Sequence, residues 1–209
     1  MESKFDYEGV KKATYDLLKA IGEDPEREGL VETPRRVAGY WKELAEGINY
    51  TNEEIAKTFK KDFEVRYNPM VTERVFDVFS HCEHHLALMY SGDAVIGYIP
   101  NPIDPDDPSK GYRVLGLSKI NRIVDLCSKR LQLQEKLAAD IAECIQLASG
   151  SNQVYVNLTL SHGCVSARGP KSRSFTTVTF MTDALKENKD AREEFERKAA
   201  EMISRGGNN

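Results

Sequence analysis

The chain has 209 residues, 40% of them hydrophobic and 30% charged, which is the composition of an ordinary globular protein. Lys and Arg total 29 and Asp and Glu total 33, so the net charge is −4, and this balance argues against general nucleic-acid binding. No apolar run approaches the roughly 18 residues that a membrane span needs. The first residues lack the apolar stretch of a secretory signal. We therefore expect a cytoplasmic protein that binds neither nucleic acid nor membrane.

The N-terminal third has the apolar spacing of helices. Residues 10–21 are expected to form a helix that ends at Gly22. Thr33 is predicted to cap a second helix, with Pro34 at its first position. Thr51 is predicted to cap a short third helix that reaches about residue 60.

Strands and helices follow in blocks. Residues 75–79 and 94–99 are rich in β-branched and aromatic side chains, which is typical of strands. Residues 100–110 contain four prolines and three aspartates and are predicted to form an exposed loop. Two helices are expected over 118–130 and 133–148, the second ending at Gly150.

The C-terminal part is predicted to contain two more strands and a helix. Residues 154–160 alternate apolar and polar side chains, the pattern of a half-buried strand, and residues 175–181 form a second, Thr-rich one. A charged helix closes the chain with an apolar stripe of Ala191, Phe195, Ala199 and Met202. Because helices and strands do not alternate strictly, the pattern favours an α+β fold with an antiparallel sheet.

Cysteine and histidine cluster in two places. All four histidines lie within three residues of Cys82 or Cys164, and these residue types are preferred zinc ligands. An open site made of Cys82, His85 and Cys164 would leave His84 and His162 for proton transfer. A closed structural site with two cysteines and two histidines is an alternative, and a chain without metal is a third. The other two cysteines, Cys127 and Cys144, lie on apolar helix faces and are expected to be small core residues.

Two basic segments suggest an anionic ligand. Lys119 and Arg122 share a face in the first turn of a predicted helix, where positive charge opposes the helix dipole unless an anion docks there. Residues 168–173 place three cations in a glycine-containing turn shortly after Cys164. Each segment has a simpler interpretation as solvated surface. Glu135 is either a favourable charge at a helix start or a carboxylate that accepts hydrogen bonds from a purine edge.

Taken together, these segments resemble the type I, zinc-dependent GTP cyclohydrolase family over roughly residues 7–200. The resemblance is carried by several uncommon strings in the expected order. They are Glu32-Thr33-Pro34-Arg35-Arg36-Val37-Ala38, Phe79-Ser80-His81-Cys82-Glu83-His84-His85, Val95-Ile96-Gly97-Tyr98-Ile99-Pro100, Gly116-Leu117-Ser118-Lys119-Ile120-Asn121-Arg122, Leu133-Gln134-Glu135, and His162-Gly163-Cys164 with Ala167-Arg168-Gly169.

The resemblance implies a tunnelling fold, an antiparallel sheet with helices packed on one side and an N-terminal helical segment. It also implies a toroidal decamer with active sites between subunits. The implied enzyme is a hydrolase acting on cyclic amidine C–N bonds, converting GTP and water to 7,8-dihydroneopterin triphosphate and formate. On this basis residues 1–65 are the helical segment, 66–205 the catalytic domain and 206–209 a flexible tail.

The resemblance also assigns roles to individual residues. The cofactor would be Zn²⁺, held by Cys82, His85 and Cys164, with His84 and His162 as catalytic residues. Residues expected to bind GTP are Gln134, Glu135, Ser118, Lys119, Arg122 and Arg168, with Arg36 from a neighbouring subunit. The chain departs from the family pattern at His81 and in the long loop over 102–113. The alternatives are a tunnelling-fold relative acting on another purine or pterin, and a zinc-stabilised binding protein without turnover.

Overall fold

The computed structural model describes residues 4–205, and contacts divide the chain into two compact units between Asn49 and Tyr50. The tail predicted at 206–209 lies outside the described residues. The domain boundary predicted at residue 65 stays a prediction.

The first unit is a pair of helices followed by a short turn. The elements are α1 (Tyr7–Ala20), α2 (Thr33–Leu44) and the 3-10 helix η1 (Glu46–Asn49). Asp6 caps α1 by accepting a hydrogen bond from the Gly9 amide at 2.9 Å. The cap of α2 is Glu32, one residue earlier than predicted, because Glu32 already has helical backbone angles. Thr33 and Pro34 thus lie inside the first turn, where proline is well tolerated.

The second unit contains a five-stranded sheet with the strand order β5-β2-β3-β6-β7 and a separate two-stranded sheet of β1 and β4. The large sheet is antiparallel except for a two-residue parallel pairing of β5 with β2. In chain order its elements are α3 (Asn52–Phe59), β1 (Asp62–Val65), β2 (Val71–Cys82), β3 (Leu88–Ile99), η2 (Pro108–Lys110), β4 (Tyr112–Leu115), α4 (Leu117–Ser128), β5 (Leu131–Gln132), α5 (Gln134–Ser149), β6 (Gln153–His162), α6 (Gly163–Ser166), β7 (Thr176–Met181), α7 (Asp183–Glu187) and α8 (Lys189–Arg205).

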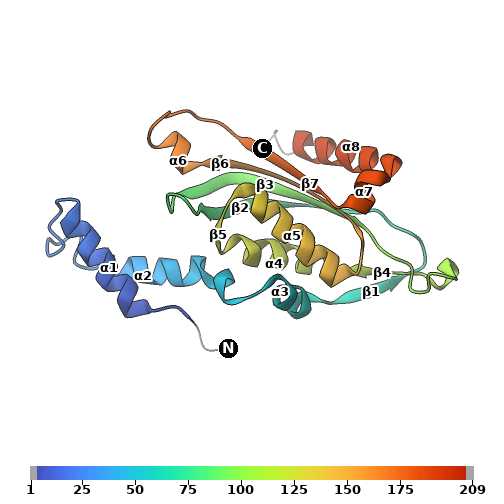
Figure 1. Ribbon diagram of the computed structural model, residues 1–209, viewed down its shortest axis with the longest axis horizontal. Helices are drawn as coiled ribbons and strands as arrows, with labels where there is room; N and C mark the ends of the chain where they lie inside the picture. Colours follow the sequence, from blue (N-terminus) through green and yellow to red (C-terminus); the bar gives the residue numbers. More distant parts are fainter. Residues whose placement is uncertain (1–3, 206–209) are drawn as a thin grey trace. The chain divides into compact units, whose positions relative to one another are not determined.

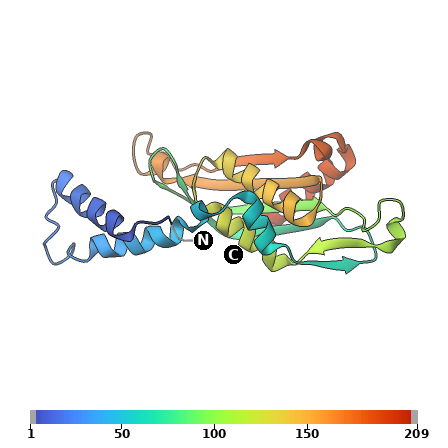
Figure 2. The same cartoon turned by 60° about the horizontal axis from the view of Figure 1, so that its bottom comes forward.

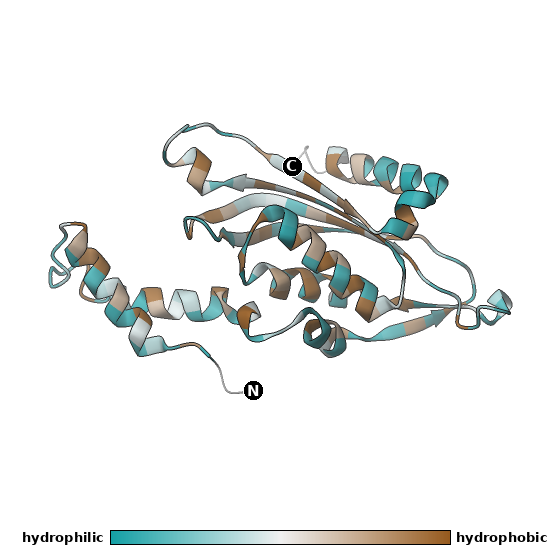
Figure 3. Ribbon diagram, in the orientation of Figure 1, coloured by the Kyte–Doolittle hydropathy of each residue, from teal (hydrophilic) through white to brown (hydrophobic). Residues whose placement is uncertain are grey.

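Helices α4 and α5 cover one face of the large sheet, as the prediction of helices on one side expects (Figure 1). Alternate strand residues such as Ala94 and Ile96 are fully buried in the core under these helices. Helix α8 packs on the opposite face, where Val95 and Tyr155 form a smaller core with Phe195. The predicted apolar stripe of α8 faces this second core and its outer side is hydrophilic (Figure 3). The apolar pattern of a helix specifies a buried face without specifying which side of a sheet will cover it.

Close backbone approach lets α8 reach the sheet. A Cβ atom at Gly97 would lie 2.4 Å from the Phe195 ring, so only glycine leaves room for that ring on β3. Phe195 also stacks on Tyr155, with ring centroids 5.7 Å apart. The apolar stripe predicted from the sequence therefore packs at a specific place on the sheet.

Local signals place the core helices where they were expected. Thr51 and Glu54 form a reciprocal capping box at the start of α3. Gly150 ends α5 in the left-handed conformation, with φ at 74°. Between α4 and α5, Cys127 and Cys144 are fully buried with their sulfur atoms 3.6 Å apart. They are the small core residues that their apolar surroundings predicted.

Strands β1 and β4 were not predicted. In the chain β1 comes before the β2–β3 hairpin and β4 comes after it, and the two strands pair antiparallel with each other (Figure 2). The buried Tyr98 hydroxyl accepts a hydrogen bond from the Leu115 amide at 2.7 Å, which ties β3 to the segment just before α4. Burial raises the pKa of Tyr98 to about 12, so it stays a neutral phenol. Over residues 4–205, no helix combines the length and apolar character needed to span a bilayer.

Candidate functional site

The tight hairpin between β2 and β3 carries two of the predicted metal ligands. Cys82 is the last residue of β2, and its carbonyl accepts the Leu86 amide at 2.9 Å while its own amide donates to the Ala87 carbonyl at 2.9 Å. Leu86 has a positive φ of 53°, which closes the turn. This folded turn brings His85 back toward Cys82, with His85 Nδ1 3.9 Å from Cys82 Sγ.

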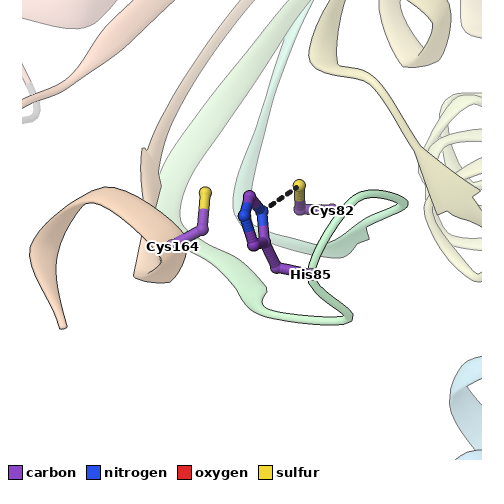
Figure 4. A group of neighbouring side chains, drawn as sticks. All are labelled: Cys82, His85 and Cys164. Carbon is purple, nitrogen blue, oxygen red and sulfur yellow. Dashed lines mark hydrogen bonds between the residues drawn. The ribbon is translucent and has the colours of Figure 1, made fainter. Parts of the chain in front are cut away.

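The third predicted ligand comes from the far end of the chain. The pairing of β3 with β6 places Met89 opposite His162, so the short helix α6 that follows β6 lies against the hairpin. Cys164 on α6 points toward Cys82 and His85 (Figure 4). One ligand atom from each of the three side chains lies within 4.8 Å of the other two. The fold therefore joins two motifs that are 77 residues apart in sequence.

The donor chemistry of this group fits a metal that prefers sulfur and nitrogen. Two thiols and one imidazole are a typical zinc ligand set, and three protein ligands leave a coordination position open. Burial raises the pKa of the Cys164 thiol, and the adjacent Cys82 thiol raises it further. Thiols must lose their protons to bind a metal, so metal binding here releases protons.

Arg168, in the basic turn over 168–173, contacts the histidine of the Cys–His–Cys group. Its guanidinium donates a hydrogen bond to His85 Nε2 at 2.9 Å. A neutral imidazole that accepts at Nε2 carries its hydrogen on Nδ1, the nitrogen nearer to Cys82. A metal bound through Nδ1 needs the lone pair there, so Arg168 must release Nε2 when such a bond forms. Arg168 is exposed and has room to move.

His162, two residues before Cys164, has its hydrogen-bond partner in α5. Below, Cys82, His85 and Cys164 are together called the metal group. Its Nε2 is 2.7 Å from Gln134 Oε1 at the start of α5. Burial lowers the pKa of His162, and the negative charge of Glu135 opposes that shift. Glu135 is exposed, whereas Gln134 is only 2% exposed. The structure thus brings His162, Gln134 and Glu135 together, and His162 is two residues before Cys164 of the Cys–His–Cys group.

The connection between α4 and α5 holds the hairpin in place. The Glu83 amide donates to the Gln132 carbonyl at 3.1 Å, and the buried Ser80 hydroxyl donates to the Ser128 carbonyl at 2.8 Å. Gln132 is fully buried, and its side-chain nitrogen donates to Asp140 at 2.9 Å. Sequence reasoning did not identify Gln132 or Asp140, because a buried polar network leaves no periodic signal.

The basic start of α4 lies well away from the metal group within one chain. Ser118 and Ser128 are ten residues apart on one helix, which is roughly 15 Å. Ser128 is the end that contacts the hairpin strand, so Lys119 and Arg122 are at the other end. Arg122 and Ser118 are exposed. The structure does not bring these predicted phosphate-binding residues together with the metal group of the same chain.

The remaining predicted residues have simpler surroundings. His84 is exposed, and its Nδ1 is 3.9 Å from Cys82 Sγ. His81 is buried in β2, where burial lowers its pKa, and it is not part of the three-residue group. Arg36 is exposed on α2 in the first unit.

An α+β unit whose Cys–His–Cys group offers three ligands, with a partly buried histidine two residues before Cys164, has the ligand number of a catalytic metal centre more than that of a closed structural one. The profile of the GTP cyclohydrolase I family matches residues 10–200. The chain belongs to this family, and its α+β architecture is the tunnelling fold expected from the resemblance.

Curated relatives agree over most of the chain. A GTP cyclohydrolase 1 of Clostridium botulinum is 41% identical over 196 residues, covering 88% of this chain and 95% of the relative. GTP cyclohydrolase 1 of Clostridium acetobutylicum is 39% identical over 191 residues, covering 89% and 93%. Among solved structures, the apo archaeosine synthase QueF-Like is similar with a TM-score of 0.36 and 19% identity, over 53% of this chain and 91% of that chain.

Proposed function

We propose that this chain hydrolyses GTP to 7,8-dihydroneopterin triphosphate and formate, the first step of pterin and folate biosynthesis. Family membership over residues 10–200 and relatives named GTP cyclohydrolase 1 support this activity. The observation that carries the proposal is the convergence of Cys82, His85 and Cys164 from two distant motifs.

Cys82, His85 and Cys164 would hold the metal, which we propose to be zinc. When bound, zinc supplies a Lewis acid that makes water nucleophilic near neutral pH at the open coordination position. The chain's own part is to present two thiols and an imidazole from a rigid hairpin and from α6. The Glu83–Gln132 hydrogen bond keeps that hairpin in register with the rest of the site.

His162 and His84 are assigned proton transfer, because His84 Nδ1 lies 3.9 Å from Cys82 Sγ and His162 is two residues before Cys164. Glu135 is exposed next to His162 and carries a carboxylate that can accept two hydrogen bonds from the N–H groups of a guanine edge. Gln134 is buried with its polar atoms already bonded, so we assign guanine recognition to Glu135.

The triphosphate needs cations, and Arg168 supplies one beside the metal group. Ser118, Lys119 and Arg122 lie at the far end of α4, so we propose that they serve the site of another copy. The start of α4 suits this task, since its first turn has no side-chain cap and no acidic residue. Arg36 would join from a further neighbour. A homo-oligomer, which the resemblance implies to be a decamer, follows from this incomplete site.

The test is turnover of GTP by zinc-loaded and chelator-treated protein, with formate and dihydroneopterin triphosphate measured by mass spectrometry. We expect product only with zinc, and its return when zinc is restored. Absence of product from protein that binds one zinc per chain would contradict the proposal and favour a sister substrate or a binding protein.

Two variants separate the metal ligands from the other thiols. Cys164→Ala is expected to lose both zinc and turnover. Cys144→Ala, which removes a thiol from the core instead, is the matched control and should keep its zinc. His162→Gln should keep zinc but lose roughly 10²- to 10⁴-fold in kcat, the usual contribution of an acid–base group. Equal zinc loss in Cys164→Ala and Cys144→Ala would overturn the ligand assignment.

A further inference from the structure

The Gln134 side chain is held at both ends by groups that fix its orientation. Its Nε2 lies 2.8 Å from the Leu158 carbonyl of β6 and 2.8 Å from the Thr176 carbonyl of β7. Carbonyl oxygens only accept hydrogen bonds, so both must face the amide nitrogen. A flipped amide would place its oxygen against two other oxygens. The Oε1 atom therefore points toward His162.

This orientation determines which nitrogen of His162 carries the hydrogen. Gln134 Oε1 has no hydrogen to give, so the 2.7 Å contact exists only if His162 Nε2 donates. In a neutral imidazole the other nitrogen, Nδ1, is then the bare acceptor. Histidine tautomers in proteins are commonly set by such a fixed partner on the opposite nitrogen.

The same contacts leave Gln134 with little to offer a ligand. Both amide hydrogens are used by strand carbonyls, its oxygen is used by His162, and the side chain is 2% exposed. Glu135, the next residue, is exposed instead. Adjacent residues at the start of α5 therefore face different environments, one the protein interior and one solvent.

We infer that Gln134 is a positioning residue that holds His162 in the Nε2–H tautomer, so that Nδ1 is the nitrogen that exchanges protons with substrate. The tautomer follows from the hydrogen bonds alone. Its kinetic consequence rests on the proposed function, because that function assigns proton transfer to His162.

The tautomer is measured first, in the full-length metal-free protein labelled with ¹⁵N-histidine. Two-bond proton–nitrogen correlation spectra distinguish a hydrogen-bearing ring nitrogen from a bare one, at a pH where the imidazole is neutral. The sequence has four histidines, and His162 is assigned by the signals missing from His162→Gln. We expect a hydrogen on Nε2 and a bare Nδ1. A hydrogen on Nδ1 would overturn the inference, whether or not the protein turns over GTP.

Gln134→Met then removes the amide while keeping the length of the side chain. We expect His162 to lose its single tautomer, and kcat of the zinc-loaded enzyme to fall about 10- to 100-fold, the usual effect of losing a partner that orients a histidine. Binding of GTP to the metal-free protein, measured by calorimetry, should be unchanged. Gln146→Met is the matched control, since it lies 12 residues along the same helix, roughly 18 Å away.

The opposite pattern would contradict the inference. A substrate contact at Gln134 predicts weaker GTP binding in Gln134→Met with the His162 tautomer preserved. Circular dichroism and the unfolding midpoint show whether Gln134→Met folds, and the wild-type spectrum decides the tautomer if it does not. An unchanged tautomer in a folded Gln134→Met protein would also refute the role. If wild-type protein does not turn over GTP but His162 carries its hydrogen on Nε2, the proposed function is refuted and the inferred tautomer is not.

Discussion

Replacing Asp140 by alanine should destabilise the second unit more than the same replacement of an exposed carboxylate would. The Asp140 side chain accepts hydrogen bonds from Lys136 at 2.6 Å, Gln132 at 2.9 Å, Arg130 at 3.0 Å and Asn52 at 3.3 Å. It thereby joins α3, the segment between α4 and β5, β5 itself and α5. Removing it leaves four donors without their common acceptor.

The magnitude follows from the burial of the charged pair. The side chains of Asp140 and Arg130 are 11% and 12% exposed, so after the substitution the Arg130 guanidinium keeps its bonds to Asn52 and Tyr50 but loses its counter-charge where water can hydrate it only in part. Removing one partner of a buried ion pair costs about 3–5 kcal/mol. Lys136 is half exposed and can return to solvent, so its lost contact adds little. We therefore expect a loss of about 3–5 kcal/mol, a large part of the stability of a typical domain.

The assay is urea unfolding followed by circular dichroism at a fixed protein concentration, because association would otherwise change the apparent stability. The matched control is Asp183→Ala, whose carboxylate is 92% exposed in its pair with Lys186 and should move the midpoint little. Equal midpoints for Asp140→Ala and wild type would show that the network is not coupled to global stability. A changed slope would indicate that the two-state treatment has failed.

Three further outcomes are expected. Burial alone would raise the pKa of Asp140, but its hydrogen bonds outweigh burial and lower the pKa, so the stability that Asp140 contributes is present above about pH 4 and is lost as the pH falls below about 4. Asp140→Asn should therefore show a weaker acid dependence of the urea midpoint than wild type, and an equal dependence would count against this. Phe195→Ala should lower the free energy of unfolding by about 3–5 kcal/mol in the same urea assay, whereas Phe175→Ala, at an exposed position, should lower it little. Similar losses in the two variants would refute the packing of α8 on the sheet through Phe195. Arg168→Ala should tighten zinc binding by about threefold in a chelator competition, since the His85 imidazole no longer has to release a hydrogen bond from Arg168, whereas Lys171→Ala should leave zinc binding unchanged. Weaker zinc binding in Arg168→Ala would contradict the argument about the His85 tautomer.

Local patterns in the sequence predicted most of the second unit's elements. Thr51 and Gly150 delimit helices because their own side chain or backbone freedom does the capping, which needs no distant partner. The alternation over 154–160 likewise predicted β6. Strands β1 and β4 were missed because each is four residues long and they pair with each other across about 45 residues of chain.

The grouping of Cys82, His85 and Cys164 was predictable from the sequence, and the residues around that group were less so. Cysteine and histidine attract attention by type, so Cys82, His85 and Cys164 could be grouped before any distance was known. Gln134 could not be separated from Glu135 by sequence, since an amide at a helix start is usually exposed. The separation of Lys119 from the hairpin depends on which end of α4 contacts β2, which no local pattern specifies.

The reactivity of the four cysteines reports on whether the protein is folded and whether it holds metal. Cys127 and Cys144 touch each other in the core, and the contact with Cys144, together with burial, raises the pKa of Cys127 well above its ordinary value. Alkylating reagents should therefore reach these two thiols only after unfolding. Cys164 is half-buried and Cys82 lies beside it, so metal-free but folded protein should react there first. The number of labelled thiols, counted by intact mass, would then separate loss of metal from loss of fold in a single sample.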